Sequence, residues 1–323
     1  MSLIVASILV LMFLNLVLGS VSIPLKSVWN IICGLGDEPV TWQNIVWKSR
    51  LPQALTALVA GAGLAISGLQ MQTVFRNPLA GPSVLGISSG ASMGVAFVVL
   101  LSGSLGGVAL SKLGFMGEIA LSIAAVIGSL SVMALIVYVS QKVKGNVTLL
   151  IIGVMIGEVA KAVFGVLKFF SVEEDIRAYV IWGLGSFSRV SGNQMMLFVA
   201  IMAILIPLSF LLIKTLNLML LGDGYARNLG LNIKRARLLV ITSAGVLTAI
   251  VTAYCGPVIF LGLAVPHLCR AIFQTSDHRV VCNLIARMPG FEGALPVNSV
   301  TALIGAPVVA SVLFRKRKNE LNE

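Results

Sequence analysis

The amino-acid sequence predicts an all-α integral membrane protein, a helical bundle that crosses the lipid bilayer many times. Of its 323 residues, 58% are hydrophobic and only 11% are charged, which is far more apolar than a soluble domain. Apolar runs of about 18 or more residues, the length needed to cross hydrocarbon, recur along the chain. Outer-membrane strands would instead be short segments of alternating polarity, so a transmembrane barrel is excluded.

The apolar runs predict the membrane spans in chain order. They are 3–21, 53–75, 84–101, 117–139, 147–170, 195–213, 238–254, the short segment 257–268 and 297–314. The first run has neither the basic start nor the small-residue cleavage site of a signal peptide, so we expect an uncleaved span. The second span ends at Asn77, because Pro78 and Pro82 cannot continue a helix.

Basic residues gather between spans on one side of the predicted bundle. The positive-inside rule assigns that side to the cytoplasm, so the net charge of +11 reports topology and not nucleic-acid binding. The opposite loops carry acidic residues, among them Glu118 and the run 173–175. The polar segment 214–237 is the one long cytoplasmic stretch, and its helical spacing predicts short helices under the membrane on which a partner docks. We treat 1–323 as a single transmembrane domain.

No pattern in the sequence predicts an enzyme or a metal site. There is no G-x-x-x-x-G-K-[ST] phosphate loop, and no paired-carboxylate or histidine-based catalytic constellation. The four cysteines lack metal-ligand spacing. His267 and His278 are the only histidines, and capping or loop hydrogen bonds account for both.

Three blocks of sequence resemble one family. The first runs from Arg50 to Ser92 and contains RLP, GAGLAISGLQMQ and NPLAGPSVLGISSGA; its small residues let helices approach closely. The others are GPVIFLGLAVPHLCR at 256–270 and LPVNSVTALIGAPV at 295–308. Together they resemble the FecCD-type permeases, which import iron-siderophores, haem and cobalamin. Gln53 and Asn298 depart from the family pattern, where Arg and Gly are usual.

The resemblance implies an assembly and a place in the cell. It implies ten spans per subunit and a homodimer with the transport pathway at its interface, in the bacterial inner (cytoplasmic) membrane. Two ATPase subunits would bind ATP and Mg, this chain would hold no cofactor, and an external substrate-binding protein would deliver a metal chelate. The family carries a longer segment between Arg279 and Ala286, completing a ninth span; here that span is truncated, either as a true deletion or because the sequence omits the segment.

The same resemblance carries over to particular residues. Arg50 and Arg287 match arginines that dock the binding protein, although an arginine at a membrane surface can also simply extend its guanidinium into water. The resemblance places the cytoplasmic gate at Asn77, Leu79, Asn146 and Val147. It places ATPase coupling at Ala226, Arg227, Leu229, Gly230 and Leu231.

Two charges stand inside the fifth apolar run. Glu158 and Lys161 are three residues apart, so they share one helix face. A charge at mid-membrane costs about 2.5–3.5 kcal/mol, so the two side chains should pair with each other or face water. They are either a structural pair packed against another helix or part of the pathway lining. They are also the one feature that supports an alternative function, that of an ion-coupled secondary transporter.

Overall fold

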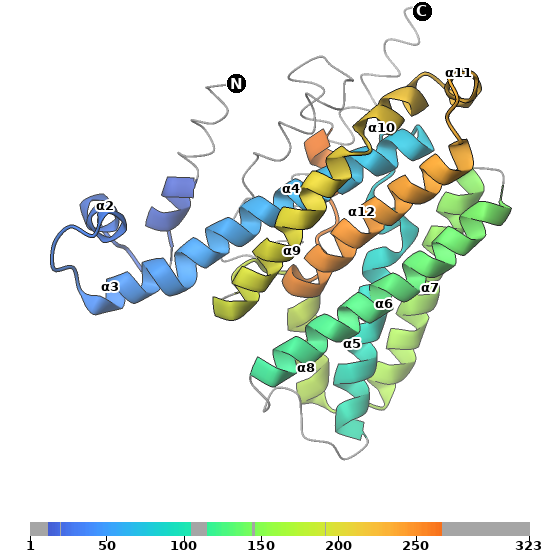
Figure 1. Ribbon diagram of the computed structural model, residues 1–323. Coiled ribbons are helices and arrows are strands. Elements are labelled where there is room, and N and C mark those ends of the chain that lie inside the picture. The colour runs from blue at the N-terminus through green and yellow to red at the C-terminus, as the bar shows by residue number, and fades with distance from the viewer. Residues whose placement is uncertain (1–11, 20, 105–114, 144–145, 191, 267–323) are drawn as a thin grey trace, which may run out of the picture.

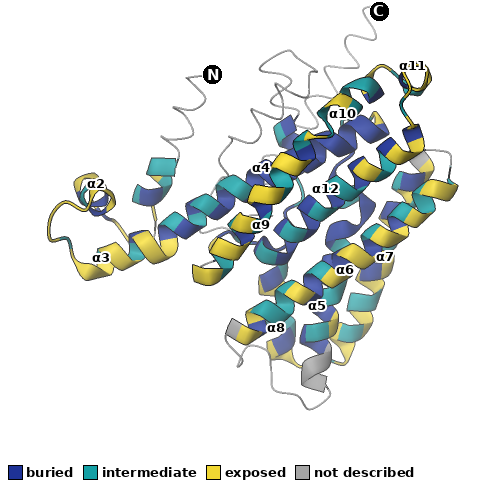
Figure 2. Ribbon diagram, viewed as in Figure 1, coloured by how far each residue is buried: buried dark blue, intermediate teal, exposed yellow. Residues whose placement is uncertain are grey.

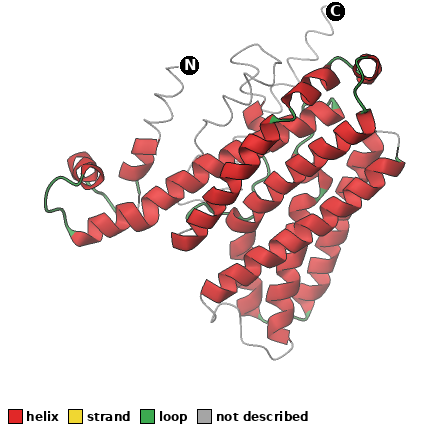
Figure 3. Ribbon diagram, in the orientation of Figure 1, coloured by secondary structure: helices red, strands yellow, loops and turns green. Residues whose placement is uncertain are grey.

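The computed structural model describes residues 12–19, 21–104, 115–143, 146–190 and 192–266. Within these ranges every regular element is a helix (Figure 3). The predicted all-α membrane bundle is therefore confirmed. Of the first predicted span, the structure describes a helical segment at 12–17, and the predicted span 297–314 lies outside the described residues.

Five helices are long and apolar enough to cross a membrane, and they coincide with predicted spans. One is continuous over Val40–Phe75 and a sixth helix, α5, has a shorter apolar stretch, Ile87–Leu100. The long elements are α4 (Leu51–Phe75), α5 (Ile87–Ser104), α6 (Phe115–Lys142), α7 (Asn146–Phe169), α9 (Gly192–Phe210) and α12 (Ile233–Cys255). The count of ten spans stays a prediction.

Short helices that the hydropathy pattern did not predict as spans precede or connect the long ones. They are α2 (Leu25–Cys33), α3 (Val40–Ile45, which continues into α4), α8 (Glu173–Gly183), α10 (Ile213–Leu220) and α11 (Asp223–Asn228). The last two lie in the segment 214–237, where short helices were expected. Helix α12 begins before the predicted start at residue 238, because the Asn232 side chain caps it by accepting a hydrogen bond from the Arg235 backbone N–H, 3.1 Å away.

The long helices form a centre and a periphery. In the most apolar stretch of each helix, 83% of the residues are buried in the helix that contains α4 and 67% in α12. The corresponding share of buried residues is 33% in α6 and 22% in both α7 and α9. Figure 1 shows α4 and α12 running side by side through the bundle, and Figure 2 shows the exposed positions gathered on the outer helices. The outer faces of α6, α7 and α9 are therefore available to lipid or to another protein.

Buried hydroxyl and amide groups join α4 to α12. The Ser67 hydroxyl lies 2.8 Å from the Ala244 carbonyl oxygen and 2.8 Å from the Thr248 hydroxyl. One turn further along α4, Gln70 Nε2 donates to the Ser243 hydroxyl at 3.1 Å. Interhelical hydrogen bonds of this kind hold helices together where both are already surrounded by apolar groups.

Helices α5 and α6 meet through residues without large side chains. A Cβ added to Gly128 would lie 2.2 Å from the Gly90 carbonyl oxygen, and one added to Gly94 would lie 2.2 Å from the Ala124 carbonyl oxygen. Gly90 and Gly94 are four residues apart on α5, as are Ala124 and Gly128 on α6. This small-residue spacing lets the two backbones touch.

This contact predicts that Gly128→Ala destabilises the protein. The added methyl group meets a backbone carbonyl, so α5 and α6 must separate, and overpacking of this kind costs about 1–3 kcal/mol. The matched control is Gly165→Ala on α7, where an added Cβ has no neighbour within 4 Å. Thermal unfolding in detergent should show a lower Tm for Gly128→Ala alone. Equal Tm values for the two variants would contradict the packing analysis.

Candidate functional site

The two ends of the bundle differ in charge. Helix α4 ends and α12 begins at the end where α10 and α11 lie (Figure 1). The described basic residues of this end are Arg76, Lys142, Lys214, Arg227, Lys234, Arg235 and Arg237. The opposite end mixes the two signs: it carries Glu118 at the start of α6 and three acidic residues in the first turn of α8, together with basic residues such as Lys48, Lys168 and Arg177. This distribution agrees with a cytoplasmic face at α10 and α11.

The predicted coupling segment divides into an inner and an outer side. Ala226 is fully buried, and Leu231 packs against the core that includes Leu216 and Met219. The Leu231 N–H donates to the Ala226 carbonyl oxygen at 2.9 Å, which closes the turn after α11. Gly230 occupies that turn at φ +86°, a conformation that favours glycine. These residues therefore anchor the segment to the bundle.

The outer side of α11 presents two large apolar side chains. Tyr225 is 72% exposed and Leu229 is 60% exposed, four residues apart and so on one helix face. Arg227 and Gly230 are exposed beside them. Tyr225 was not among the predicted coupling residues. Its four-residue spacing from Leu229 is the signal in the sequence that could have identified it.

The break after α4 is a defined turn. Arg76 ends the helix at φ +47°, the one non-glycine residue with positive φ in the described chain. The Leu79 N–H then donates to the Asn77 side-chain oxygen at 2.9 Å, and a short 3₁₀ turn, Pro82–Leu85, leads into α5. Asn77 and Leu79 are half-buried in this turn.

Helix α7 packs directly on that turn. A Cβ added to Gly153 would lie 2.5 Å from the Val84 carbonyl oxygen. Asn146 and Val147 begin α7, and their side chains lie outside the described residues. The structure thus brings the first half of α7 against the segment that follows Asn77 and Leu79, while the gate role of the four residues stays a prediction.

Glu158 and Lys161 form an ion pair on the exposed face of α7. The Lys161 Nζ donates to Glu158 Oε1 at 2.7 Å, and the two side chains are 72% and 62% exposed respectively. The same face carries exposed apolar side chains, namely Ile151, Val154, Met155, Val159, Val166 and Phe169. Within the described chain the pair is therefore not packed against another helix.

Arg50 is buried and holds the end of the first helical segment. It is 6% exposed, and its guanidinium donates to the carbonyl oxygens of Leu16 at 2.7 Å and Val17 at 2.8 Å, and to that of Val21. The π-helical turn Val46–Arg50 precedes α4 and carries this side chain. These partners occupy the side chain, so docking of a binding protein at Arg50 stays a prediction and would require this cluster to open.

The outer end also has an enclosed carboxyl group. Asp175 in the first turn of α8 is buried, and this burial, reinforced by neighbouring Glu174, raises the pKa of the Asp175 carboxyl. In the loop before α9, burial lowers the pKa of the Arg189 guanidinium, and the charge of Glu118 opposes that effect. Glu118 also accepts a hydrogen bond from Gln194 at 3.0 Å. Polar contacts therefore fix the start of α9 to the start of α6.

Some predicted residues cannot be placed. Arg287, His267 and His278 lie outside the described residues. Among the residues that are described, no group of three or more His, Cys, Asp or Glu side chains could hold a metal ion.

Similar proteins match most of the length of the chain. Residues 7–315 match the FecCD transport family. The vitamin B12 import system permease protein of Klebsiella pneumoniae is 34% identical over 289 residues, covering 85% of this chain and 84% of that one. The hemin transport system permease protein of Yersinia pestis is 31% identical over 317 residues, covering 93% and 91%.

A solved structure has the same fold. It is described as an inward-facing conformation of a metal-chelate type ABC transporter, and it superposes with a TM-score of 0.78 at 26% identity, covering 96% of this chain and 97% of that one. The helical bundle, its charge distribution and these matches agree with the resemblance drawn from the sequence motifs. The chain belongs to the FecCD transport family.

Proposed function

We propose that this chain is the membrane-spanning permease subunit of an ATP-driven importer in the bacterial inner membrane, with a metal chelate such as an iron-siderophore, haem or cobalamin as its substrate. The family match over residues 7–315 carries the proposal. Relatives that cover most of the chain are permeases for vitamin B12 and hemin. Several long apolar helices supply the membrane-spanning part.

Partner subunits supply the energy in this proposal. The chain has no phosphate-binding loop, so ATP and Mg would bind to two separate ATPase subunits. Helix α11 supports such docking, since Tyr225 and Leu229 project from a short helix that Ala226 anchors to the bundle. Large exposed apolar side chains on a polar face are typical of protein interaction sites. A substrate-binding protein would dock on the opposite end.

A second copy of the chain would complete the pathway. Helix α7 exposes an apolar face with the Glu158–Lys161 pair in its middle. Facing lipid, each charge would cost about 2.5–3.5 kcal/mol, whereas a wet cavity between two protomers would leave the pair solvated. The exposed face of α7 therefore supports a homodimer whose pathway this helix lines.

The function is tested by reconstitution with candidate ATPase and binding proteins. We expect uptake of a chelate into proteoliposomes only when ATP and the ATPase subunits are present. An ion-coupled secondary transporter, the alternative supported by Glu158 and Lys161 alone, would instead take up substrate from an ion gradient without them. Uptake of that kind would overturn the proposal, and the ligand that copurifies with the binding protein would identify the chelate.

The exposed side of α11 predicts a selective effect of charge at Tyr225. Tyr225→Asp places a carboxylate in the apolar contact with the ATPase subunit, so binding of that subunit should weaken at least tenfold, about 1.4 kcal/mol. Tyr225→Phe keeps the apolar ring and should bind as the wild type does. Copurification and uptake measure both variants. Gly230 is a poorer test, because its positive φ makes any substitution strained. Normal binding by Tyr225→Asp would remove α11 from the interface.

The ion pair on α7 predicts coupled effects of its two substitutions. Glu158→Gln or Lys161→Met alone leaves one unpaired charge in the pathway, whereas the double change leaves none. Each single change should therefore reduce uptake more than the double change does, and a double-mutant cycle measures this coupling. Lys168→Met, an exposed lysine in the last turn of α7, is the matched control. Additive effects of Glu158→Gln and Lys161→Met would contradict a pathway-lining pair.

A further inference from the structure

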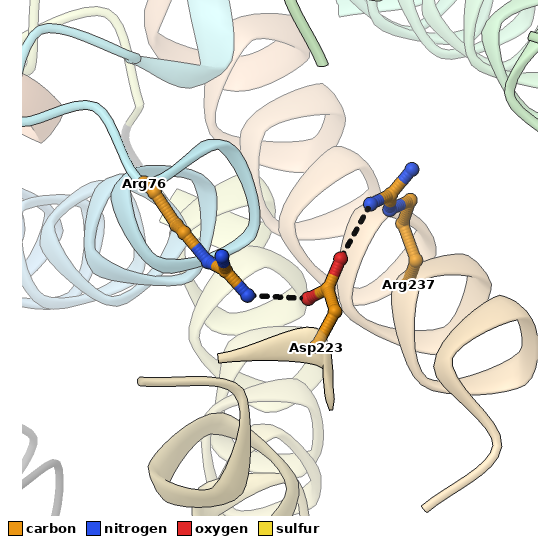
Figure 4. A network of polar contacts seen from close by, with 3 residues as sticks. All are labelled: Arg76, Asp223 and Arg237. Carbon is orange, nitrogen blue, oxygen red and sulfur yellow. Dashed lines mark hydrogen bonds and ion pairs between the residues drawn. The ribbon is translucent and has the colours of Figure 1, made fainter. Parts of the chain in front are cut away.

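Three charged residues from three separate elements meet at the cytoplasmic end of the bundle. Figure 4 shows the Asp223 carboxylate between the guanidinium groups of Arg76 and Arg237. Arg76 Nη2 lies 2.5 Å from Asp223 Oδ1, and Arg237 Nη2 lies 3.7 Å from Asp223 Oδ2. The two oxygens of the Asp223 carboxylate therefore each contact a different arginine.

The three residues occupy the points where the neighbouring elements start or stop. Arg76 directly follows α4, Asp223 is the first residue of α11, and Arg237 lies in the second turn of α12. The carboxylate thus joins the helix that carries Tyr225 and Leu229 to both central helices of the bundle. We name these three residues the Asp223 clamp.

The clamp reaches the predicted gate through a strained residue. Arg76 has φ +47°, and it immediately precedes Asn77, whose side chain accepts the Leu79 N–H. A non-glycine residue keeps a left-handed conformation only where its surroundings hold it there. The Arg76 and Asn77 N–H groups donate to the Thr73 and Gln72 carbonyl oxygens, each at 3.2 Å, and these bonds close the end of α4 around this conformation. The Arg76 side chain adds a contact with Asp223, which links α11 to the residue at which the break begins.

We propose that Asp223 is a positioning residue that transmits movement of α11 to the Asn77–Leu79 break. The inference rests on the proposed function, in which ATPase subunits dock on α11. The side chains of Arg76 and Asp223 are about half exposed, at 46% and 41%, while Arg237 is the more enclosed at 16%. Exposed ion pairs contribute little to overall stability, so loss of the clamp should leave the protein folded. It should instead change how much substrate is transported for each ATP hydrolysed.

A simpler role for Asp223 makes a different prediction. A carboxylate in the first turn of a helix is stabilised by the helix dipole, and Asp223 would then serve α11 alone. In that case Arg76 would be irrelevant, and the effects of changing Arg76 and Asp223 would be independent. Coupling between the two residues therefore distinguishes the clamp from a helix-end charge.

The first experiment measures substrate transported per ATP hydrolysed in the reconstituted complex. Asp223→Asn and Arg76→Gln should each lower this ratio about two- to fivefold, the range expected for an exposed ion pair. The double variant should be no worse than the poorer single variant, and Asp223→Glu should restore most of the ratio. The matched control is Arg235→Gln, which removes an exposed arginine from the same first turns of α12. Additive losses, or an equal loss in Arg235→Gln, would overturn the proposal.

A second measurement does not depend on transport. Hydrogen exchange in the complex should become faster in Asp223→Asn both within α11 and at residues 76–80, because both segments lose a shared restraint. Faster exchange within α11 alone would support the helix-end role and refute the clamp. If the wild-type complex does not couple ATP hydrolysis to uptake at all, the proposed function fails. If it does couple and every clamp variant matches the wild type, only the present inference fails.

Discussion

The bundle depends on the close approach of α4 and α12. In a membrane, the burial of apolar side chains contributes little to the association of two helices. Lipid chains are as apolar as leucine, so helices there associate through packing and hydrogen bonds. The Ser67 hydroxyl contacts the Ala244 carbonyl and the Thr248 hydroxyl of α12. The helical segment 261–266, which follows α12, packs on the same part of α4, since a Cβ added to Gly68 would overlap the Gly262 carbonyl oxygen. Gln72 Nε2 also donates to the Leu263 carbonyl at 3.3 Å. The motif GAGLAISGLQMQ is therefore, to a large extent, a packing motif.

Much of the fold could be predicted because its signals are local. Length and hydropathy are properties of a single segment, and they identified α4, α6, α7, α9 and α12. Helix ends were less certain, since they depend on particular contacts such as the Asn232 cap of α12. Helix α8 was not predicted at all, because its acidic first turn and short length resemble an external loop.

The site was predictable in location but not in orientation. Basic residues placed the segment 214–237 on the cytoplasmic side, yet only its docking on the bundle decides that Ala226 is buried and Tyr225 exposed. The same limit applies to Arg50. Its carbonyl partners lie 29–34 residues earlier in the chain, so no local pattern distinguishes an arginine that reaches outward from one that holds a helix end.

The continuous helix Val40–Phe75 is longer than a membrane crossing needs. At 1.5 Å per residue, its 36 residues extend about 54 Å, well beyond the thickness of the hydrocarbon. Ser67 joins it to α12 about 13 Å from the Arg76 end and about 40 Å from Val40. The excess length lies at the Val40 end, where Figure 1 shows α3 projecting beyond the other long helices.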